Sequence, residues 1–375
     1  MNTWYFPHCP TSPEWKIEWT KLEAKFDWLS NLANCLQNPI YHAEGDVLIH
    51  TRLVCEALVS LPTWRQLPET ERNILFAAAL LHDVAKPEAT NIEEDGKITA
   101  KGHVRLGSKM AREILWELEV PFYEREAIVS LIEYGSLPLW FWDKISPQRS
   151  IIRASQIVRC DWIALLAEAD VKGRECDDQK QLLESIEFFR EFCQENECFN
   201  QPRQFASPHS RFVYFHKENA DPNYAAYDDT KFEVTLMSGL PAAGKDTWIE
   251  ENAGNLPIIS LDELRQKMNI SPEENQGEVV QAAKNKAKEY MKTGTSFVWN
   301  ATNISSMIRS SLIRLFAAYQ ARVKIIYLEA PLPELLRRNN TRKAKVPEKV
   351  IERLAYRLEI PNLTEAHSVN WLVDY

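Results

Sequence analysis

The fold of the second half of the chain is decided by residues 232–247, which read FEVTLMSGLPAAGKDT. The opening run is mostly apolar or β-branched, as in a buried strand. The remainder matches the GxxxxGK pattern of a phosphate-binding loop, the P-loop, which joins a strand to a helix. Gly239 and Gly244 let the backbone turn its N–H groups inward, and Lys245 brings a positive charge to the phosphates. The stretch therefore predicts a nucleotide site on an α/β sheet.

Asp246 stands where such loops usually carry a Ser or Thr that binds Mg²⁺, and Thr247 follows it. A carboxylate beside a triphosphate is repelled unless a cation lies between them. We therefore expect Asp246 to hold Mg²⁺, directly or through water, with the Thr247 oxygen also suited to that ion. The predicted cofactor is ATP or another NTP with Mg²⁺.

Strand-like runs continue beyond this loop. Residues 256–260, 296–299 and 323–328 have the character of buried strands, and helical stretches separate them. This alternation is typical of a parallel sheet flanked by helices.

The first half of the chain has a different texture. Residues 14–200 show apolar positions at helical spacing almost throughout. Residues 202–231 combine weak periodicity with Pro, Asn and Asp, which favour turns. We therefore predict an all-α domain at residues 1–201, a linker at 202–231 and an α/β domain at 232–375.

The composition is that of a folded protein with an acidic balance. The 375 residues are 45% hydrophobic and 26% charged, with a formal net charge of −9. These values exclude a disordered or collagen-like chain. Any contact with nucleic acid must use a local basic patch, because the overall field repels phosphates. The apolar runs are shorter than the ~20 residues that span a bilayer, and the first 13 residues lack the pattern of a secretory signal. We expect no membrane partner.

The cysteines favour a reducing compartment. There are seven, all before residue 199, and none forms a CxxC pair. A disulfide framework or a zinc ribbon is therefore not expected, and the predicted location is the cytoplasm. Cys193 and Cys198 lie in a polar stretch, and we do not expect them to bind a metal.

An acidic and a basic residue follow the second strand of the α/β half. Asp262 and Arg265 are three residues apart and share one face of a predicted helix. A carboxylate at a strand end, facing the γ-phosphate, is placed to accept the proton of an attacking hydroxyl. The alternative is that Asp262 caps the helix and Arg265 is merely exposed.

A basic cluster follows the fourth strand. Residues 331–358 contain eight Lys or Arg against three Glu. Five of these basic residues are Arg337, Arg338, Arg342, Lys343 and Lys345. Such a cluster can be a solvated helix face. Its position, however, is where phosphotransferases of this class carry a lid whose arginines close over the transferring group.

These motifs together resemble the 5′-hydroxyl polynucleotide kinases. The resemblance rests on the P-loop, on Asp-x-x-Arg, on Asn300-Ala301-Thr302-Asn303, and on the run from Arg338 through Arg342 to Val346-Pro347. It covers about 145 residues. It implies that Asp262 is the general base, that Arg265 contacts the phosphate 3′ of the acceptor nucleoside, and that Arg338 and Arg342 hold the donor phosphates.

The helical half carries an ordered set of metal-binding residue types. His50 is followed by His82-Asp83 and then by Asp161, and Lys86 lies one turn after Asp83. Burying a carboxylate at a helical core is costly unless it meets a cation. Mixed imidazole and carboxylate ligands suit a transition divalent ion such as Mn²⁺, Co²⁺, Ni²⁺ or Zn²⁺. A lone His-Asp pair would more often lie at the surface.

This half resembles the HD-domain metal-dependent phosphohydrolases, especially the HD domains of bacterial tRNA nucleotidyltransferases. The resemblance implies metal ligation by His50, His82, Asp83 and Asp161. It places Lys86 and His103 near the scissile phosphate, Lys86 as electrophile and His103 as phosphate contact or acid. His42 and Asp170 are further candidates. For His42, a ligand, a phosphate contact and a structural histidine remain open.

The order of the two halves resembles the bacterial bifunctional HD-domain polynucleotide phosphatase–kinases, which heal RNA ends. The resemblance implies that the first domain removes a 2′,3′-cyclic, 2′- or 3′-phosphate and that the second phosphorylates a 5′-hydroxyl. The implied partners are RNA or DNA ends, with an RNA ligase acting downstream. Two alternatives remain: both activities on small metabolites, or a nucleotide sensor without catalysis.

Overall fold

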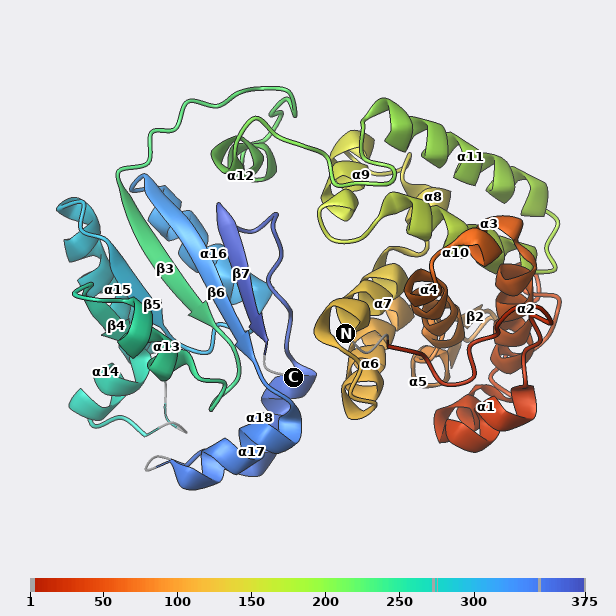
Figure 1. Cartoon of the computed structure of the whole chain (residues 1–375), viewed down its shortest axis with the longest axis horizontal. Coiled ribbons are helices and arrows are strands. Elements are labelled where there is room, and N and C mark those ends of the chain that lie inside the picture. The colour runs from red at the N-terminus through yellow and green to blue at the C-terminus, as the bar shows by residue number, and fades with distance from the viewer. Residues whose placement is uncertain (1–3, 272–273, 275, 343–344, 374–375) are drawn as a thin grey trace. The chain divides into compact units, whose positions relative to one another are not determined.

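The computed structural model describes residues 4–271, 274, 276–342 and 345–373, so Lys343 of the basic cluster lies outside the described residues. The chain divides into two compact units, Met1–Gln204 and Phe205–Tyr375. The first is helical and the second contains a sheet flanked by helices (Figure 1). The predicted class, an all-α domain followed by a parallel α/β domain, is confirmed.

The first unit is built from short and medium helices, with one small hairpin. In chain order its elements are α1 (Trp19–Lys25), η1 (Asp27–Leu32), α2 (Val47–Ser60), α3 (Pro62–Gln66), α4 (Glu69–Leu81), α5 (Lys86–Ala89), β1 (Asn91–Ile92), β2 (Ile98–Thr99), α6 (His103–Glu117), α7 (Phe122–Tyr134), α8 (Leu137–Trp140), α9 (Pro147–Ser155), α10 (Cys160–Lys172) and α11 (Gln179–Glu195). The antiparallel pair β1–β2 was not predicted, because two residues a strand leave no alternation to detect.

Helix α4 forms the centre of this unit. Every residue from Asn73 to Leu81 is buried, because α4 packs against α2, α7 and α10. A helix that is apolar on all sides belongs in a core. His82 and Asp83 follow directly, so the chain leaves its most buried helix at these two residues.

The cysteines all lie in this unit, and all seven are free thiols. Cys160, Cys193 and Cys198 are fully buried, and their sulfur atoms lie within 4.8 Å of one another.

The second unit contains a five-stranded sheet in the order β4-β5-β3-β6-β7, with every neighbouring pair parallel. Its elements are α12 (Pro208–His216), β3 (Phe232–Ser238), α13 (Lys245–Asn252), β4 (Ile258–Ser260), α14 (Leu261–Lys267), α15 (Gly277–Lys292), β5 (Phe297–Asn300), α16 (Ser306–Ala317), β6 (Ala321–Glu329), α17 (Leu332–Thr341), α18 (Glu348–Tyr356) and β7 (Ser368–Val373). Because the strands are parallel, their carboxyl ends share one edge, where ligands of such sheets bind.

The fifth strand and helix α12 were not predicted. β7 lies at the sheet edge and is only partly buried, so it lacks the continuous apolar run of a central strand. Helix α12 falls inside the segment predicted as a linker. It starts at a Ser207 cap with Pro208 in its first turn, and it buries Phe212 in the core of the second unit. Residues 205–231 of the predicted linker belong to the α/β unit.

No helix in the described parts of the chain is both long enough and apolar enough to cross a membrane.

Candidate active sites

The first candidate site gathers imidazole and carboxylate groups from three helical segments. His50 lies on α2, His82 and Asp83 follow α4, and Asp170 lies on α10. His50 Nε2 is 3.3 Å from His82 Nε2, 3.7 Å from Asp83 Oδ2 and 3.2 Å from Asp170 Oδ1. His82 Nε2 is 3.1 Å from Asp83 Oδ2 and 4.0 Å from Asp170 Oδ1. We call these four residues the HD cluster.

The structure corrects the prediction for Asp161. This residue begins α10, but its carboxylate pairs with Arg159 on its own chain segment, with Oδ2 2.6 Å from Nη2. The carboxylate that reaches His50 is Asp170, on the same helix. Both residues are acidic and both lie on α10, so the sequence order fitted either. Only the packing of α10 against α2 and α4 distinguishes them.

The donor atoms of the HD cluster fit a divalent cation. The Nδ1 atom of His82 lies 2.8 Å from the carbonyl oxygen of Ala79 and that of His50 lies 2.7 Å from Glu44 Oε1. The Ala79 contact favours the proton of a neutral His82 ring on Nδ1, and Glu44 lies on the Nδ1 side of His50, so the Nε2 atoms of both rings face one region. Burial alone would raise the pKa of Asp83, but the charges of His82 and Lys86 hold that pKa well below its usual range. Two imidazoles and two ionised carboxylates are a donor set for a transition divalent ion.

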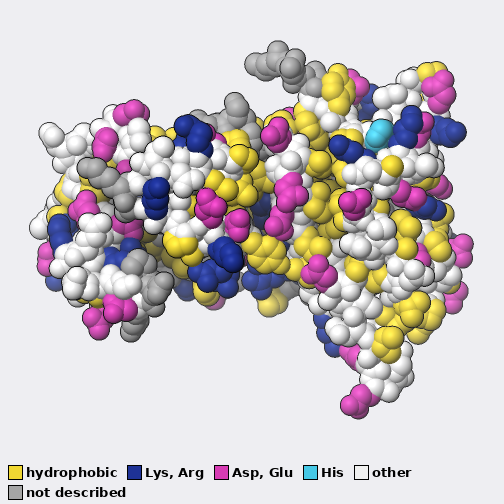
Figure 2. Space-filling model, turned by 90° about the horizontal axis from the view of Figure 1, so that it is seen from below, with side chains coloured by type: hydrophobic (Ala, Val, Ile, Leu, Met, Phe, Trp, Pro, Cys, Tyr) yellow, Lys and Arg dark blue, Asp and Glu magenta, His cyan; other side chains and the backbone are white. Residues whose placement is uncertain are grey.

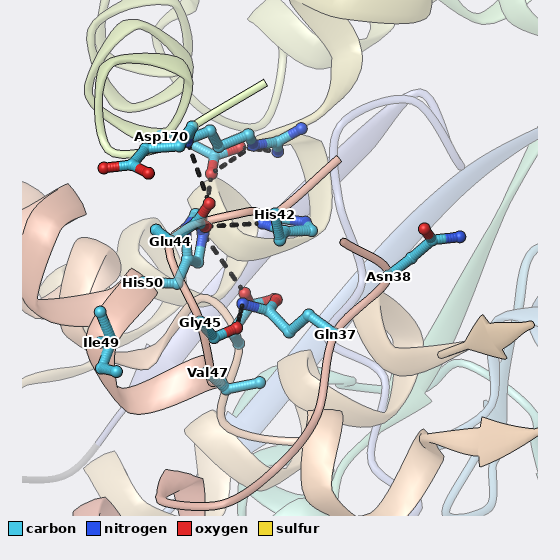
Figure 3. Close-up of polar contacts among 12 residues, drawn as sticks. Gln37, Asn38, His42, Glu44, Gly45, Val47, Ile49, His50 and Asp170 are labelled. Carbon is cyan, nitrogen blue, oxygen red and sulfur yellow. Dashed lines mark hydrogen bonds and ion pairs between the residues drawn. The ribbon is translucent and has the colours of Figure 1, made fainter. Parts of the chain in front are cut away.

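Glu44 is a supporting residue that the sequence did not reveal as functional. Its Oε1 is 2.7 Å from His50 Nδ1 and 2.9 Å from His42 Nδ1. Figure 3 shows these three side chains. Burial raises the pKa of Glu44, yet contacts with His42 and His50 outweigh it and lower the pKa well below the ordinary value. A carboxylate behind a metal-binding histidine fixes its tautomer and orientation. His42 therefore supports Glu44, which favours the structural interpretation left open for it.

Lys86 and His103 lie against Asp83. Lys86 is buried, and its Nζ is 2.7 Å from Asp83 Oδ2 and 2.6 Å from Gln37 Oε1. His103 begins α6, with Nδ1 2.6 Å from the carbonyl oxygen of Ala100 and Nε2 3.7 Å from Asp83 Oδ1. The Nδ1 contact leaves His103 Nε2 available to hold or release a proton facing the cluster. Gln37 is a contact that sequence reasoning missed.

The HD cluster opens into a cavity of about 490 Å³. The lining includes His82, Asp83, Lys86, His103 and Asp170. Arg174, which pairs with Asp170 through Nε and Nη2, also lines it. A cationic wall beside ionised carboxylates suits a ligand that is anionic.

The second candidate site is the P-loop at the end of β3, the central strand of the sheet. Gly239 has φ 145° and Gly244 has φ 99°, backbone conformations that favour glycine. A Cβ at Gly239 would also collide with the carbonyl oxygen of Leu328. The loop therefore requires glycine at both positions, and it leads into the amino end of α13, where phosphate binds.

Lys245 lies against this loop. Its Nζ donates to the carbonyl oxygens of Gly239 and Leu240 at 3.0 and 2.7 Å. Burial of the ammonium lowers the pKa of Lys245 to about 8, although Asp246 and Asp262 act in the opposite direction. Asp246 and Thr247 are exposed in the first turn of α13.

Asn300 and Arg342 meet Asp246 at the same place. Asn300, at the carboxyl end of β5, donates its Nδ2 to Asp246 Oδ1 at 2.7 Å. Arg342 approaches the other carboxylate oxygen, with Nη2 3.6 Å from Oδ2. The structure thus brings one predicted lid arginine to the P-loop carboxylate, and it adds Asn300 as a contact whose role the sequence did not specify.

Asp262 does not cap its helix. The cap of α14 is Ser260, whose side chain accepts from Glu263 N. The Asp262 carboxylate is 77% exposed and pairs with Arg265. Its negative charge also acts on Lys245, where it partly offsets the lowering of the pKa by burial. Arg265 is further fixed by Gln276, with Nε 2.7 Å from Oε1. The helix-cap alternative is therefore wrong for Asp262.

Arg338 and Arg337 lie on α17 but differ in placement. Arg338 Nη1 is 4.0 Å from where a Cβ on Gly244 would stand, so its guanidinium is beside the P-loop. Both arginines pair with Glu334, but Arg337 is 70% exposed against 32% for Arg338. Figure 2 views the molecule from the side where α17 and α18 lie in Figure 1, and basic and acidic side chains are interspersed on that face.

Comparisons with known proteins match the two units separately. Residues 47–158 match the family model of the HD domain, and residues 234–361 match that of an AAA domain. The L-seryl-tRNA(Sec) kinase of Methanococcus maripaludis is 27% identical over an alignment that covers 34% of this chain and 53% of the relative. The chain thus spans about half the length of this curated relative. A solved structure assigned as a kinase of Chloroflexus aurantiacus has 19% identity and a TM-score of 0.34, covering 39% of this chain and 86% of its own.

The matches and the geometry define two kinds of domain on one chain. The first is an HD phosphohydrolase domain, and HD domains bind divalent metals. The second is a P-loop kinase-like domain, which implies a nucleotide with Mg²⁺.

Proposed function

We propose that this chain heals nucleic-acid ends. The HD domain removes a 2′,3′-cyclic, 2′- or 3′-phosphate, and the P-loop domain phosphorylates a 5′-hydroxyl. Breakage of RNA by internal attack of the 2′-hydroxyl leaves a 2′,3′-cyclic phosphate on one end and a 5′-hydroxyl on the other. Their conversion to a 3′-hydroxyl and a 5′-phosphate would prepare the ends for a ligase.

In the phosphatase, His50, His82, Asp83 and Asp170 would hold the metal, which when bound activates a water molecule. Water gives up a proton to the solvent as it forms a bond to phosphorus, the bond from phosphorus to one ribose oxygen breaks, and that oxygen takes up a proton. A 2′,3′-cyclic phosphate needs this step twice, first to open the ring and then to release the monoester phosphate. The Nε2 atom of His103 faces this region and is the group placed to supply the proton. Lys86, held between Asp83 and Gln37, fixes the carboxylate and adds positive charge to the phosphate site.

In the kinase, the acceptor oxygen forms a bond to the γ-phosphorus and the bond to the β-phosphate oxygen breaks. Asp262 takes the proton of the attacking hydroxyl. Lys245, Arg338 and Arg342 surround the transferring group with positive charge, which stabilises the transition state. Arg265 remains available at the side of Asp262 for a phosphate of the acceptor.

The observation that carries the kinase assignment is the exposed Asp262–Arg265 pair, with the Asp262 charge acting on Lys245. Ser260 already caps the helix, so Asp262 is not needed as a cap. A nucleotide sensor without transfer would not need a general base at this edge of the sheet.

The test uses a short RNA with a 5′-hydroxyl and a 2′,3′-cyclic phosphate, incubated with NTP, Mg²⁺ and Mn²⁺. We expect a 5′-phosphate and a 3′-hydroxyl on the same molecule, read by mass spectrometry. Transfer to free nucleosides alone, or release of phosphate only from small metabolites, would contradict the proposal.

A second acceptor is favoured by one comparison. The matched relative is named for phosphorylating the seryl group of a tRNA, so its acceptor hydroxyl is attached to RNA but is not a ribose 5′-hydroxyl. A parallel reaction with seryl-tRNA distinguishes the two. Faster transfer to the seryl hydroxyl than to a 5′-hydroxyl end would replace our assignment of the acceptor.

A further inference from the structure

The cavity beside the HD cluster is larger than a phosphate group requires. Its volume of about 490 Å³ falls in the range of sites that bind whole organic molecules. Its charged part holds His82, Asp83 and Asp170 of the HD cluster with Lys86, His103 and Arg174, and uncharged polar side chains such as Gln37 and Thr99 also line it. A ligand that fills the cavity must therefore carry a phosphate at one end and a further group beyond it.

Another part of the cavity wall is apolar. It comes from the β2–α6 segment, from α7 and α8, and from α10. The apolar lining residues are Ile98, Val104, Leu131, Ile132, Leu139 and Leu166. Apolar lining with a few polar groups at one end favours a ligand with a flat or apolar body.

Two large aromatic side chains complete the lining and are half exposed. Tyr41, in the loop before α2, and Trp140, at the end of α8, each have 51% relative exposure. Exposed aromatic faces in a cavity that also binds phosphate are the usual stacking surfaces for nucleobases, because every base offers a π-face.

We propose that the apolar part of this cavity binds the terminal nucleobase of the phosphorylated end, with Trp140 and Tyr41 as its stacking surfaces. The proposal rests on the phosphatase activity proposed above. It makes the HD site selective for a nucleoside phosphate over a phosphate on a carrier without a base. It also predicts little discrimination among the four bases, since stacking tolerates each of them.

The experiment compares two RNA substrates that both end in a 3′-phosphate. In one the last nucleotide is complete, and in the other it lacks its base. The full chain is assayed as wild type, as Trp140→Ala and as Tyr41→Ala. Matched controls are Trp142→Ala and Tyr123→Ala, which alter exposed aromatic residues of the same unit that are not among those lining the cavity.

We expect Trp140→Ala and Tyr41→Ala each to raise the KM for the complete RNA by roughly 5- to 150-fold, the scale of one stacked base. The KM for the RNA lacking its last base should be high in the wild type and unchanged in these variants. The controls should behave as wild type.

Two failures have different meanings. Equal KM values for both RNAs in an active wild type would overturn the nucleobase site and leave the phosphatase standing. Hydrolysis of phosphorylated sugars or peptides without hydrolysis of either RNA would overturn the proposed function itself. Loss of activity on both RNAs in Trp140→Ala, with unchanged helical circular dichroism, would assign Trp140 a structural role and reject its stacking role.

Discussion

The Nε2 atoms of His50 and His82 lie 3.3 Å apart and face each other. The opposite nitrogen of each ring contacts an oxygen atom outside the pair, from Glu44 or Ala79. In their neutral forms, which metal binding requires, the two imidazoles direct their Nε2 lone pairs at one region. A divalent cation held there would contact both nitrogen atoms.

Replacing Asp170 should have a much larger effect than replacing Asp161 on the same helix. Asp170→Asn removes a charge from the HD cluster, so we expect a loss of bound metal and at least a ~100-fold loss of phosphatase activity. Asp161→Asn, the matched control, breaks only a partly exposed pair with Arg159 and should retain metal and activity. Metal content by plasma mass spectrometry and phosphate release measure the two effects. A larger loss for Asp161→Asn would restore the prediction made from sequence order.

Glu44 should act through His50. Glu44→Ala removes the carboxylate 2.7 Å from His50 Nδ1, and residues in this position typically change metal affinity by about 10- to 100-fold. We expect the metal concentration for half-maximal phosphatase activity to rise by that factor, while activity at saturating metal recovers most of its value. If saturating metal restores nothing in a folded variant, Glu44 has another role.

The pKa of Lys245, lowered to about 8 by burial, predicts proton uptake on nucleotide binding. Triphosphate oxygens beside the ammonium raise that pKa. At pH 8 binding should take up about half a proton, and affinity should fall as the pH rises further. Calorimetry in buffers of different ionisation enthalpy measures the uptake. Lys245→Arg, which stays charged, should abolish it, and uptake that persists in Lys245→Arg would assign the proton to another group.

Helix α14 offers a matched pair for the kinase chemistry. Asp262→Asn keeps the shape but removes the proton acceptor, so kcat should fall by roughly 10²–10⁴ with little change in NTP binding. Glu263→Gln alters the neighbouring carboxylate, which is exposed and pairs only loosely with Lys267. It should leave the rate near wild type. Similar losses for both variants would indicate a general charge effect rather than a base.

Helix α17 offers a second pair. Arg338→Ala removes the guanidinium beside Gly244, and we expect a fall in kcat of ~100-fold or more through lost stabilisation of the transferring group. Arg337→Ala removes a neighbour that pairs with Glu334 and is mostly exposed, so its effect should be small. Single-turnover phosphoryl transfer is the measurement. If Arg337→Ala lowered the rate as much as Arg338→Ala does, the special role of Arg338 at the transferring group would be contradicted.

The sequence predicted the architecture well where local patterns decide it. The P-loop and its strand could be predicted because glycine spacing and apolar runs are local signals. Asp170 was only a further candidate and Glu44 was not singled out, since their roles depend on which turn of α10 faces α2 and on how the loop before α2 folds back. β7 and α12 were not predicted, because each is only partly apolar and is stabilised by packing against the rest of the unit.

In the function proposed above, one chain carries two separate active sites for nucleic-acid ends, a phosphatase and a 5′-hydroxyl kinase. The most direct measurement uses an RNA with a 5′-hydroxyl and a 3′-phosphate and follows both ends in Asp83→Ala and Lys245→Ala. We expect Asp83→Ala to lose phosphatase activity and to keep kinase activity within several-fold of the wild type. Lys245→Ala should do the reverse. If either substitution abolished both activities in a folded protein, the two-site account would be contradicted.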